Sequence, residues 1–208
     1  IFGSRTKLTL PDGTLVWLNA GSRITYSQGF GVGNRKIELI GEGYFEVKRN
    51  EEVPFLVKTN SLLVKVLGTK FNFRDYPDDA EAIVSLSEGK VALNNLLKKE
   101  KEAFLLPNER VVLNKKNGRM HVEYSTVSNA LQWTNGYLFF DEELLPDVVK
   151  ELERSYNVKI QIASDTLNTF RFYGNFVHRE QNIQEVLEAL SATRKIHYII
   201  EGHNITLY

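Results

Sequence analysis

The chain has 208 residues, with 26 basic and 26 acidic side chains and no cysteine. This length allows one large domain or two small ones, each with a core of its own. The balanced charge argues against a bulk attraction to nucleic acid or to an anionic membrane. The lack of cysteine excludes disulfides, thiolate zinc sites and a cysteine nucleophile.

No apolar run approaches the ~20 residues that a membrane helix requires. The chain opens with Ile1 rather than methionine, so we expect it to be a piece of a longer protein. A signal peptide or membrane anchor would then lie upstream of this sequence.

The first part of the chain, residues 7–124, predicts an all-β domain. Short runs rich in Val, Phe and Tyr recur about every ten residues and are separated by Gly, Pro or charged clusters, which is typical of a sandwich- or solenoid-like fold. Alternation along the strands predicts a core that contains Val64, Val66, Phe71 and Phe73.

Glycines punctuate these predicted strands. Residues 35–40 alternate polar and apolar side chains before Gly41-Glu42-Gly43, and the glycines at 29, 31 and 33 form a loop. Neither group is followed by a helix, so neither forms a phosphate-binding loop. The break in alternation at residues 67–69 predicts a bulge or a bend.

From about residue 128 onward the pattern changes to α+β. Apolar residues at helical spacing predict helices over residues 145–156 and 183–190. Strands are predicted at 137–140, 158–162, 170–176, 196–200 and 204–207. The two halves each read strand–helix–strand, which predicts a small βαβ-repeat module. We therefore expect two domains, 1–128 and 129–208.

Catalytic, cofactor-binding and metal-binding residues are not indicated. The histidines at 121, 178, 197 and 203 lack metal-ligand spacing, and the paired acidic residues lie in polar turns or at a helix start. No serine lies in a Gly-x-Ser-x-Gly elbow. We expect a protein that is not an enzyme and that requires no cofactor.

Several motifs resemble FecR-type regulators of cell-surface signalling. The first reads LPDGTLVWLNAGS and the second GEGYFEV, beginning at Leu10 and Gly41. Further matching segments span almost the whole chain: residues 54–57, 66–73, 88–91, 106–109 and 133–140. The last part is similar to the short secretin/TonB N-terminal module that is common in Bacteroidetes members.

The resemblance implies an anti-sigma factor, of which this chain would be the periplasmic part. Such regulators are single-pass inner-membrane proteins whose cytoplasmic segment binds an ECF-type sigma factor. Their periplasmic part receives a signal from the N-terminal signalling domain of a TonB-dependent outer-membrane transporter. In many Bacteroidetes that transporter belongs to the SusC-like glycan-uptake class. Family members are not enzymes.

The partner site is predicted at a sheet edge, because two modules of this kind can associate through main-chain hydrogen bonds. The candidate edge strand runs from Phe170 to Asn175, with Arg171 and Tyr173 on one face and Phe170 and Phe172 on the other. These four residues are the predicted partner-binding residues. The alternative is a central strand that is merely packed.

The rival function is a periplasmic module that binds a glycan or small ligand directly. Exposed aromatic side chains would form its platform, and Trp17, Tyr26 and Tyr44 are the nearest candidates. Core packing is the alternative role for these aromatic residues.

Overall fold

The computed structural model describes residues 3–192 and 194–208, with only the backbone of Val127. The chain divides into two compact units, an N-terminal unit of Arg5–Leu131 and a C-terminal unit of Gln132–Tyr208 that also includes Gly3 and Ser4. No helix among the described residues is long and apolar enough to cross a membrane. The predicted boundary after residue 128 stays a prediction.

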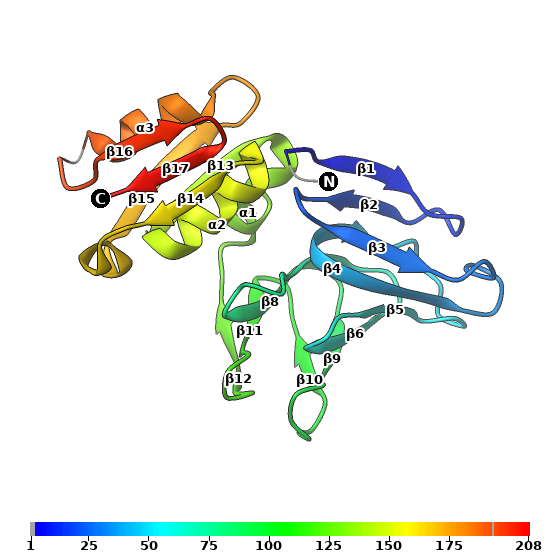
Figure 1. The fold of residues 1–208 in the computed structure, drawn as a ribbon. Helices are drawn as coiled ribbons and strands as arrows, with labels where there is room; N and C mark the ends of the chain where they lie inside the picture. Colours follow the sequence, from blue (N-terminus) through cyan, green and yellow to red (C-terminus); the bar gives the residue numbers. More distant parts are fainter. Residues whose placement is uncertain (1–2, 193) are drawn as a thin grey trace. The chain divides into compact units, whose positions relative to one another are not determined.

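The N-terminal unit is mainly β (Figure 1). Its strands are β1 (Thr6–Thr9), β2 (Leu15–Leu18), β3 (Arg23–Tyr26), β4 (Arg35–Glu46), β5 (Phe55–Lys58), β6 (Leu62–Val66), β7 (Lys70–Asp75), β8 (Glu81–Glu88), β9 (Val91–Asn95), β10 (Ala103–Leu105), β11 (Glu109–Asn114) and β12 (Met120–Tyr124). A short helix, α1 (Val127–Ala130), follows them.

These strands form one continuous sheet that folds over at β4. The first half of β4 pairs with β3 and β5, and this layer continues through β6 and β9 to β10. The second half pairs with β2 and β7, and this layer continues through β8 and β11 to β12. The inward side chains of both layers share one core, which makes the fold sandwich-like.

Gly41-Glu42-Gly43 lies between two runs that the sequence presents as separate strand-like segments, but β4 runs through it as a single strand. Gly41 has φ +98°, and a side chain there would lie 2.5 Å from Ser22 Oγ. Glycine therefore bends the strand from one layer to the other instead of ending it. Residues 67–69, where a bulge or bend was predicted, form the connection from β6 to β7.

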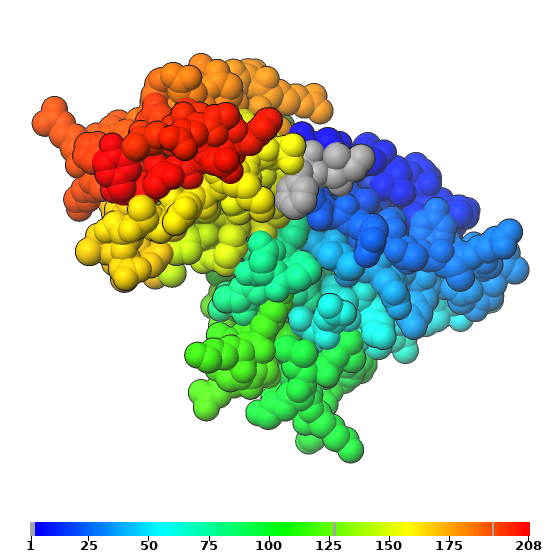
Figure 2. All heavy atoms as spheres, viewed as in Figure 1, coloured from blue at the N-terminus to red at the C-terminus, as the bar shows by residue number. Residues whose placement is uncertain are grey.

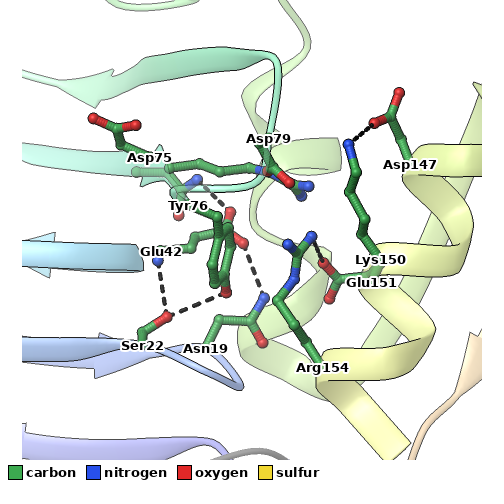
Figure 3. A network of polar contacts seen from close by, with 12 residues as sticks. Asn19, Ser22, Glu42, Asp75, Tyr76, Asp79, Asp147, Lys150, Glu151 and Arg154 are labelled. Atoms are coloured by element: carbon green, nitrogen blue, oxygen red, sulfur yellow. Dashed lines mark hydrogen bonds and ion pairs between the residues drawn. The ribbon is translucent and has the colours of Figure 1, made fainter. Parts of the chain in front are cut away.

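A buried hydrogen-bond network holds this bend (Figure 3). The Glu42 N–H donates to Ser22 Oγ at 2.8 Å, and Tyr76 Oη lies 3.2 Å from the same oxygen. The Glu42 carboxylate accepts from the side-chain amides of Asn19 at 2.9 Å and Asn72 at 2.8 Å. Both oxygens of this buried carboxylate are thus hydrogen-bonded, as burial of a charged group requires.

The core of the N-terminal unit confirms the alternation read from the sequence. Phe45 stacks on Phe71 at a centroid distance of 5.1 Å, and neither side chain is exposed. The four predicted core residues Val64, Val66, Phe71 and Phe73 are all buried. The hairpins β9–β10 and β11–β12, in green in Figure 2, project from the surface of this unit, and the charged tip at residues 98–102 is largely exposed.

A second buried polar cluster surrounds Arg35 at the start of β4. Its guanidinium donates to the carbonyl oxygens of Val53 (2.8 Å), Lys48 (2.7 Å) and Asn50 (3.1 Å), and to the Asp12 carboxylate at 3.2 Å. The Arg35 side chain is 3% exposed. One arginine thereby joins the turn before β2 to the loop between β4 and β5.

The described residues of the C-terminal unit form five strands and two longer helices, arranged as in Figure 1. In order these elements are η1 (Gln132–Asn135), β13 (Tyr137–Leu144), α2 (Leu145–Tyr156), β14 (Lys159–Ile162), η2 (Asp165–Thr169), β15 (Arg171–Val177), α3 (Ile183–Ser191), β16 (Tyr198–Glu201) and β17 (Asn204–Leu207). Both predicted helices are found. Asn182 and Glu185 form a capping box at the start of α3, and Asn157 ends α2 in a left-handed conformation.

The strand–helix–strand order occurs twice, but the strands pair across the halves. β13 pairs antiparallel with β15, and β14 pairs parallel with β17, which also pairs with β16. The chain therefore builds a two-stranded and a three-stranded sheet, and α2 contacts strands of both. Leu145, Val148 and Leu152 of α2 are fully buried in the core that results.

Candidate functional site

The two-stranded sheet β13–β15 carries the candidate partner site. The β15 sequence RFYGNFV alternates exposed and buried side chains, as expected of a strand with one face on a core. Opposite Tyr173, β13 contains a bulge between Phe140 and Glu143, with Glu142 at φ 53°. The Arg171 guanidinium donates to the Glu142 carbonyl at 2.6 Å and so fixes the bulge.

The hydrogen bonds at both ends of β15 show which of its backbone groups face β13. The Phe170 carbonyl accepts from Leu145 N at 2.8 Å, and His178 N donates to the Gly136 carbonyl at 3.0 Å. Because bonding direction alternates along a strand, even-numbered residues from 170 to 178 face β13. The N–H and C=O groups of Arg171, Tyr173 and Asn175 therefore point to the other edge.

That other edge has no pairing strand among residues 3–192 and 194–208. It ends at Val177, whose N–H donates to the Gln181 side chain at 2.9 Å and whose carbonyl accepts from the N–H groups of Glu180 and Gln181. Three consecutive outward positions, Arg171, Tyr173 and Asn175, thus present unpaired backbone groups. We call this the open edge. Such an edge is a template for an added strand.

The two faces of the sheet differ sharply in burial. On the core face Phe172 and Phe176 are buried and lie parallel, 6.1 Å apart. Gly174 between them leaves room for both rings, since a Cβ there would lie 2.7 Å from Phe172. On the outer face Tyr173 is 69% exposed and packs edge-on against Phe139 at 6.4 Å. An incoming strand would meet this aromatic pair.

The predicted site residues therefore divide by role. Arg171 and Tyr173 lie on the open edge with exposed side chains, whereas Phe172 is in the core and Phe170 is half-buried against it. The predicted edge strand extends to Asn175, but the predicted partner-binding residues do not include it, although period-two alternation from Tyr173 predicts that it faces the same way. The sequence prediction also missed Phe139, because no local pattern shows which strand pairs with β15.

The three aromatic candidates for a glycan platform are not on one surface. Trp17 and Tyr44 are cross-strand partners on β2 and β4, 5.3 Å apart, with Lys7 Nζ 4.4 Å from the Trp17 ring. Tyr44 is 8% exposed. Tyr26 packs on Phe30 at 5.1 Å on the other layer.

Tyr44 is held in its neutral form. Burial raises the pKa of Tyr44 to about 12, and the nearby Glu46 carboxylate, which accepts its hydrogen bond at 3.3 Å, acts in the same direction. Because the folded pKa lies above the ordinary tyrosine value of about 10, this group stabilises the fold below pH ~10 and loses that contribution as the pH rises toward 12. These contacts assign Tyr44 to the packed interior.

Metal-ligating side chains do not gather in the part of the chain that the structure describes. No group of three or more His, Asp or Glu residues there has a geometry that could hold a metal ion. His178 instead bonds the Ser155 carbonyl through Nε2 at 2.8 Å and packs on Tyr156 at 4.8 Å. The expectation of a protein without catalysis or cofactor stays a prediction.

Comparison with known proteins assigns both units. Residues 2–92 match the family described as FecR protein, and residues 137–207 match the family described as FecR, C-terminal. No curated protein sequence matches the chain. Two crystal structures of a candidate anti-sigma factor from Parabacteroides distasonis, at 1.65 and 2.50 Å resolution, are each 34% identical and have TM-scores of 0.90 and 0.89. Each alignment covers 100% of this chain and 95% of the other.

The all-β unit followed by an α+β unit is thus the architecture of an anti-sigma regulatory protein. This chain belongs to the FecR family. The resemblance stated from the sequence motifs is confirmed, and so is the mainly β plus α+β fold class.

Proposed function

We propose that the chain is the periplasmic sensor portion of a membrane-anchored anti-sigma regulator. Its C-terminal unit receives the N-terminal signalling domain of a TonB-dependent outer-membrane transporter. A cytoplasmic segment of the same protein controls an ECF sigma factor. FecR-family membership supports the regulatory role, and the open edge of β15 supports the mode of reception.

The open edge carries this proposal because it offers recognition without a special side-chain motif. Arg171, Tyr173 and Asn175 supply alternating N–H donors and C=O acceptors for a strand from the partner. Edge strands are commonly blunted by proline, by inward-pointing charges or by covering loops. β15 contains no proline, and its exposed Tyr173 adds apolar area beside the unpaired backbone.

Proline at position 173 tests the proposal, because it removes one outward N–H and leaves the β13 ladder intact. We expect calorimetry to show that Tyr173→Pro weakens binding of the signalling domain by tenfold or more, with the domain taken from the TonB-dependent transporter encoded beside this protein. A tenfold loss of affinity corresponds to ~1.4 kcal/mol of binding free energy. The loss of one main-chain hydrogen bond together with a steric clash can account for this amount.

Tyr137→Pro is the matched control. Tyr137 is opposite Val177 at the end of the sheet, away from the Phe139–Tyr173 pair, and by the same alternation its N–H points away from β15 toward the opposite edge. We expect this variant to bind within about twofold of the wild type, with circular dichroism showing that both variants are folded. Unchanged binding by Tyr173→Pro, or an equal loss in both variants, would refute the assignment to the β15 edge.

A further inference from the structure

A groove crosses the outer face of the layer formed by β3, β4, β5 and β6 in the N-terminal unit. Its volume is about 840 Å³, and its lining is mostly apolar. Leu56 and Pro54 form part of the lining, as does Tyr26, which is 40% exposed. Lys36 and Lys65 line it as well, and both side chains are exposed.

Strand register places the two lysines on either side of Leu56. Lys65 on β6 is directly opposite Leu56 on β5, and Leu56 is directly opposite Lys36 on β4. Since neighbouring strands are ~4.8 Å apart, the two lysine Cα atoms lie about 10 Å apart. Across β4, β5 and β6 the side chains therefore follow the order Lys36, Leu56, Lys65, with an apolar side chain between two cations.

Neither lysine is neutralised by the protein. Lys36 and Lys65 form no ion pair with a carboxylate of the described residues, and neither does Lys58 beside them on the same face. Glu38 is the acidic residue that lines the groove. A chain with no net charge thus concentrates unpaired positive charge around an apolar hollow.

We propose that this groove binds an acidic polypeptide segment in which an apolar side chain lies between carboxylates. The apolar side chain contacts Leu56 and Pro54, and the carboxylates pair with Lys36 and Lys65. A polyproline-II segment has three residues per turn, so the carboxylates just before and just after an apolar residue point to opposite sides of it, about 120° away. The order carboxylate, apolar side chain, carboxylate matches the order Lys36, Leu56, Lys65 across the groove.

The concave shape favours a peptide over an anionic bilayer. A bilayer surface attracts exposed lysines in rough proportion to their number, whatever lies between them. A segment that enters the groove instead needs the apolar contact at Leu56 as well as the charges. The inference concerns the N-terminal unit alone and does not depend on the transporter-receiving role.

The test uses fluorescence anisotropy with the full chain and the labelled peptide EELEELEE. We expect saturable binding that weakens about tenfold in Lys36→Gln/Lys65→Gln, since each exposed ion pair contributes a few-fold. Lys58→Gln is the matched control, because Lys58 lies on the same face outside the groove, and it should change affinity less than twofold. Replacing both leucines of the peptide with serine should weaken its binding to the wild type. The same replacement should not change the affinity for Leu56→Ser, which already lacks the apolar contact.

Three results would overturn the proposal. The first is no saturable binding of EELEELEE, and the second is an equal loss in Lys58→Gln and in the double variant. The third comes from sedimentation with vesicles containing about one-third phosphatidylglycerol. Vesicle binding that falls with each lysine removed, while the serine and leucine peptides bind equally, would assign the lysines to a bilayer surface. Circular dichroism of each variant checks the fold.

Discussion

Replacing Arg35 with methionine is expected to lower the free energy of unfolding of the Arg5–Leu131 unit by about 3–5 kcal/mol, the usual cost of breaking a buried ion pair. The substitution keeps much of the side-chain volume but removes every donor. It leaves three backbone carbonyls without this partner and removes the cation beside the buried Asp12 carboxylate. Among the residues that the structure describes, Thr14 then remains as the partner of that carboxylate, through its N–H and hydroxyl.

Urea unfolding measures this loss. Trp17 fluorescence in a Trp133→Phe background reports on the N-terminal unit alone, because Trp133 belongs to the other unit. With a urea m-value of ~2 kcal/mol/M, the midpoint should fall by about 2 M.

Two further variants make the Arg35 result interpretable. Arg35→Lys should lose almost as much stability, since one ammonium cannot reach the four acceptors that the planar guanidinium contacts. Arg49→Met is the matched control, because the Arg49–Glu51 ion pair is 78% and 63% exposed and such pairs contribute ~0–1 kcal/mol. A decrease of less than ~1 kcal/mol in the free energy of unfolding of Arg35→Met would contradict the stabilising role assigned to the buried cluster around Arg35.

The second large effect is expected at the bend of β4. Gly41→Ala should cost ~3 kcal/mol or more, because it combines an unfavourable positive φ with overpacking. The added Cβ would lie 2.5 Å from Ser22 Oγ and 2.9 Å from Ser22 Cα. Ser22 cannot retreat without releasing its hydrogen bond from the Glu42 N–H. The same Trp17-monitored urea unfolding measures the change.

Gly33→Ala separates the two causes. Gly33 also has a positive φ, +77°, but no heavy atom lies within 4 Å of a Cβ built there. Backbone strain alone should therefore cost about 1 kcal/mol. If the two alanine variants were equally stable, the close approach to Ser22 would not be what requires glycine at the bend.

The spacing of apolar residues along the chain predicts which segments form strands or helices and which of their side chains are buried. Alternation identifies Phe71 and Phe73 as core residues, and helical spacing identifies α2 and α3. The same alternation places Arg35 on the apolar face with Ile37 and Leu39. That was a readable signal of a buried cation, but its partners come from turns and loops whose positions only the folded chain defines.

Pairing between distant strands could not be predicted in this way. The repeat predicts that the two halves together form one module, but it does not show which strands pair: β13 pairs with β15 and β14 pairs with β17, in each case across the halves. Likewise, Gly41-Glu42-Gly43 lies between two runs that the sequence presents as separate strand-like segments, whereas tertiary packing extends β4 through it. The open edge therefore depends on a fact absent from the local pattern, namely that β15 has one strand partner and not two among the described residues.

Residue-resolved amide hydrogen exchange on this chain, with and without the transporter signalling domain, tests the central claim most directly. Before binding, the Phe172 and Gly174 amides should be protected by β13, whereas those of Arg171, Tyr173 and Asn175 should exchange fast. Binding through an added strand should then protect Arg171, Tyr173 and Asn175. Saturable binding that leaves these three amides in fast exchange would contradict reception at the open edge.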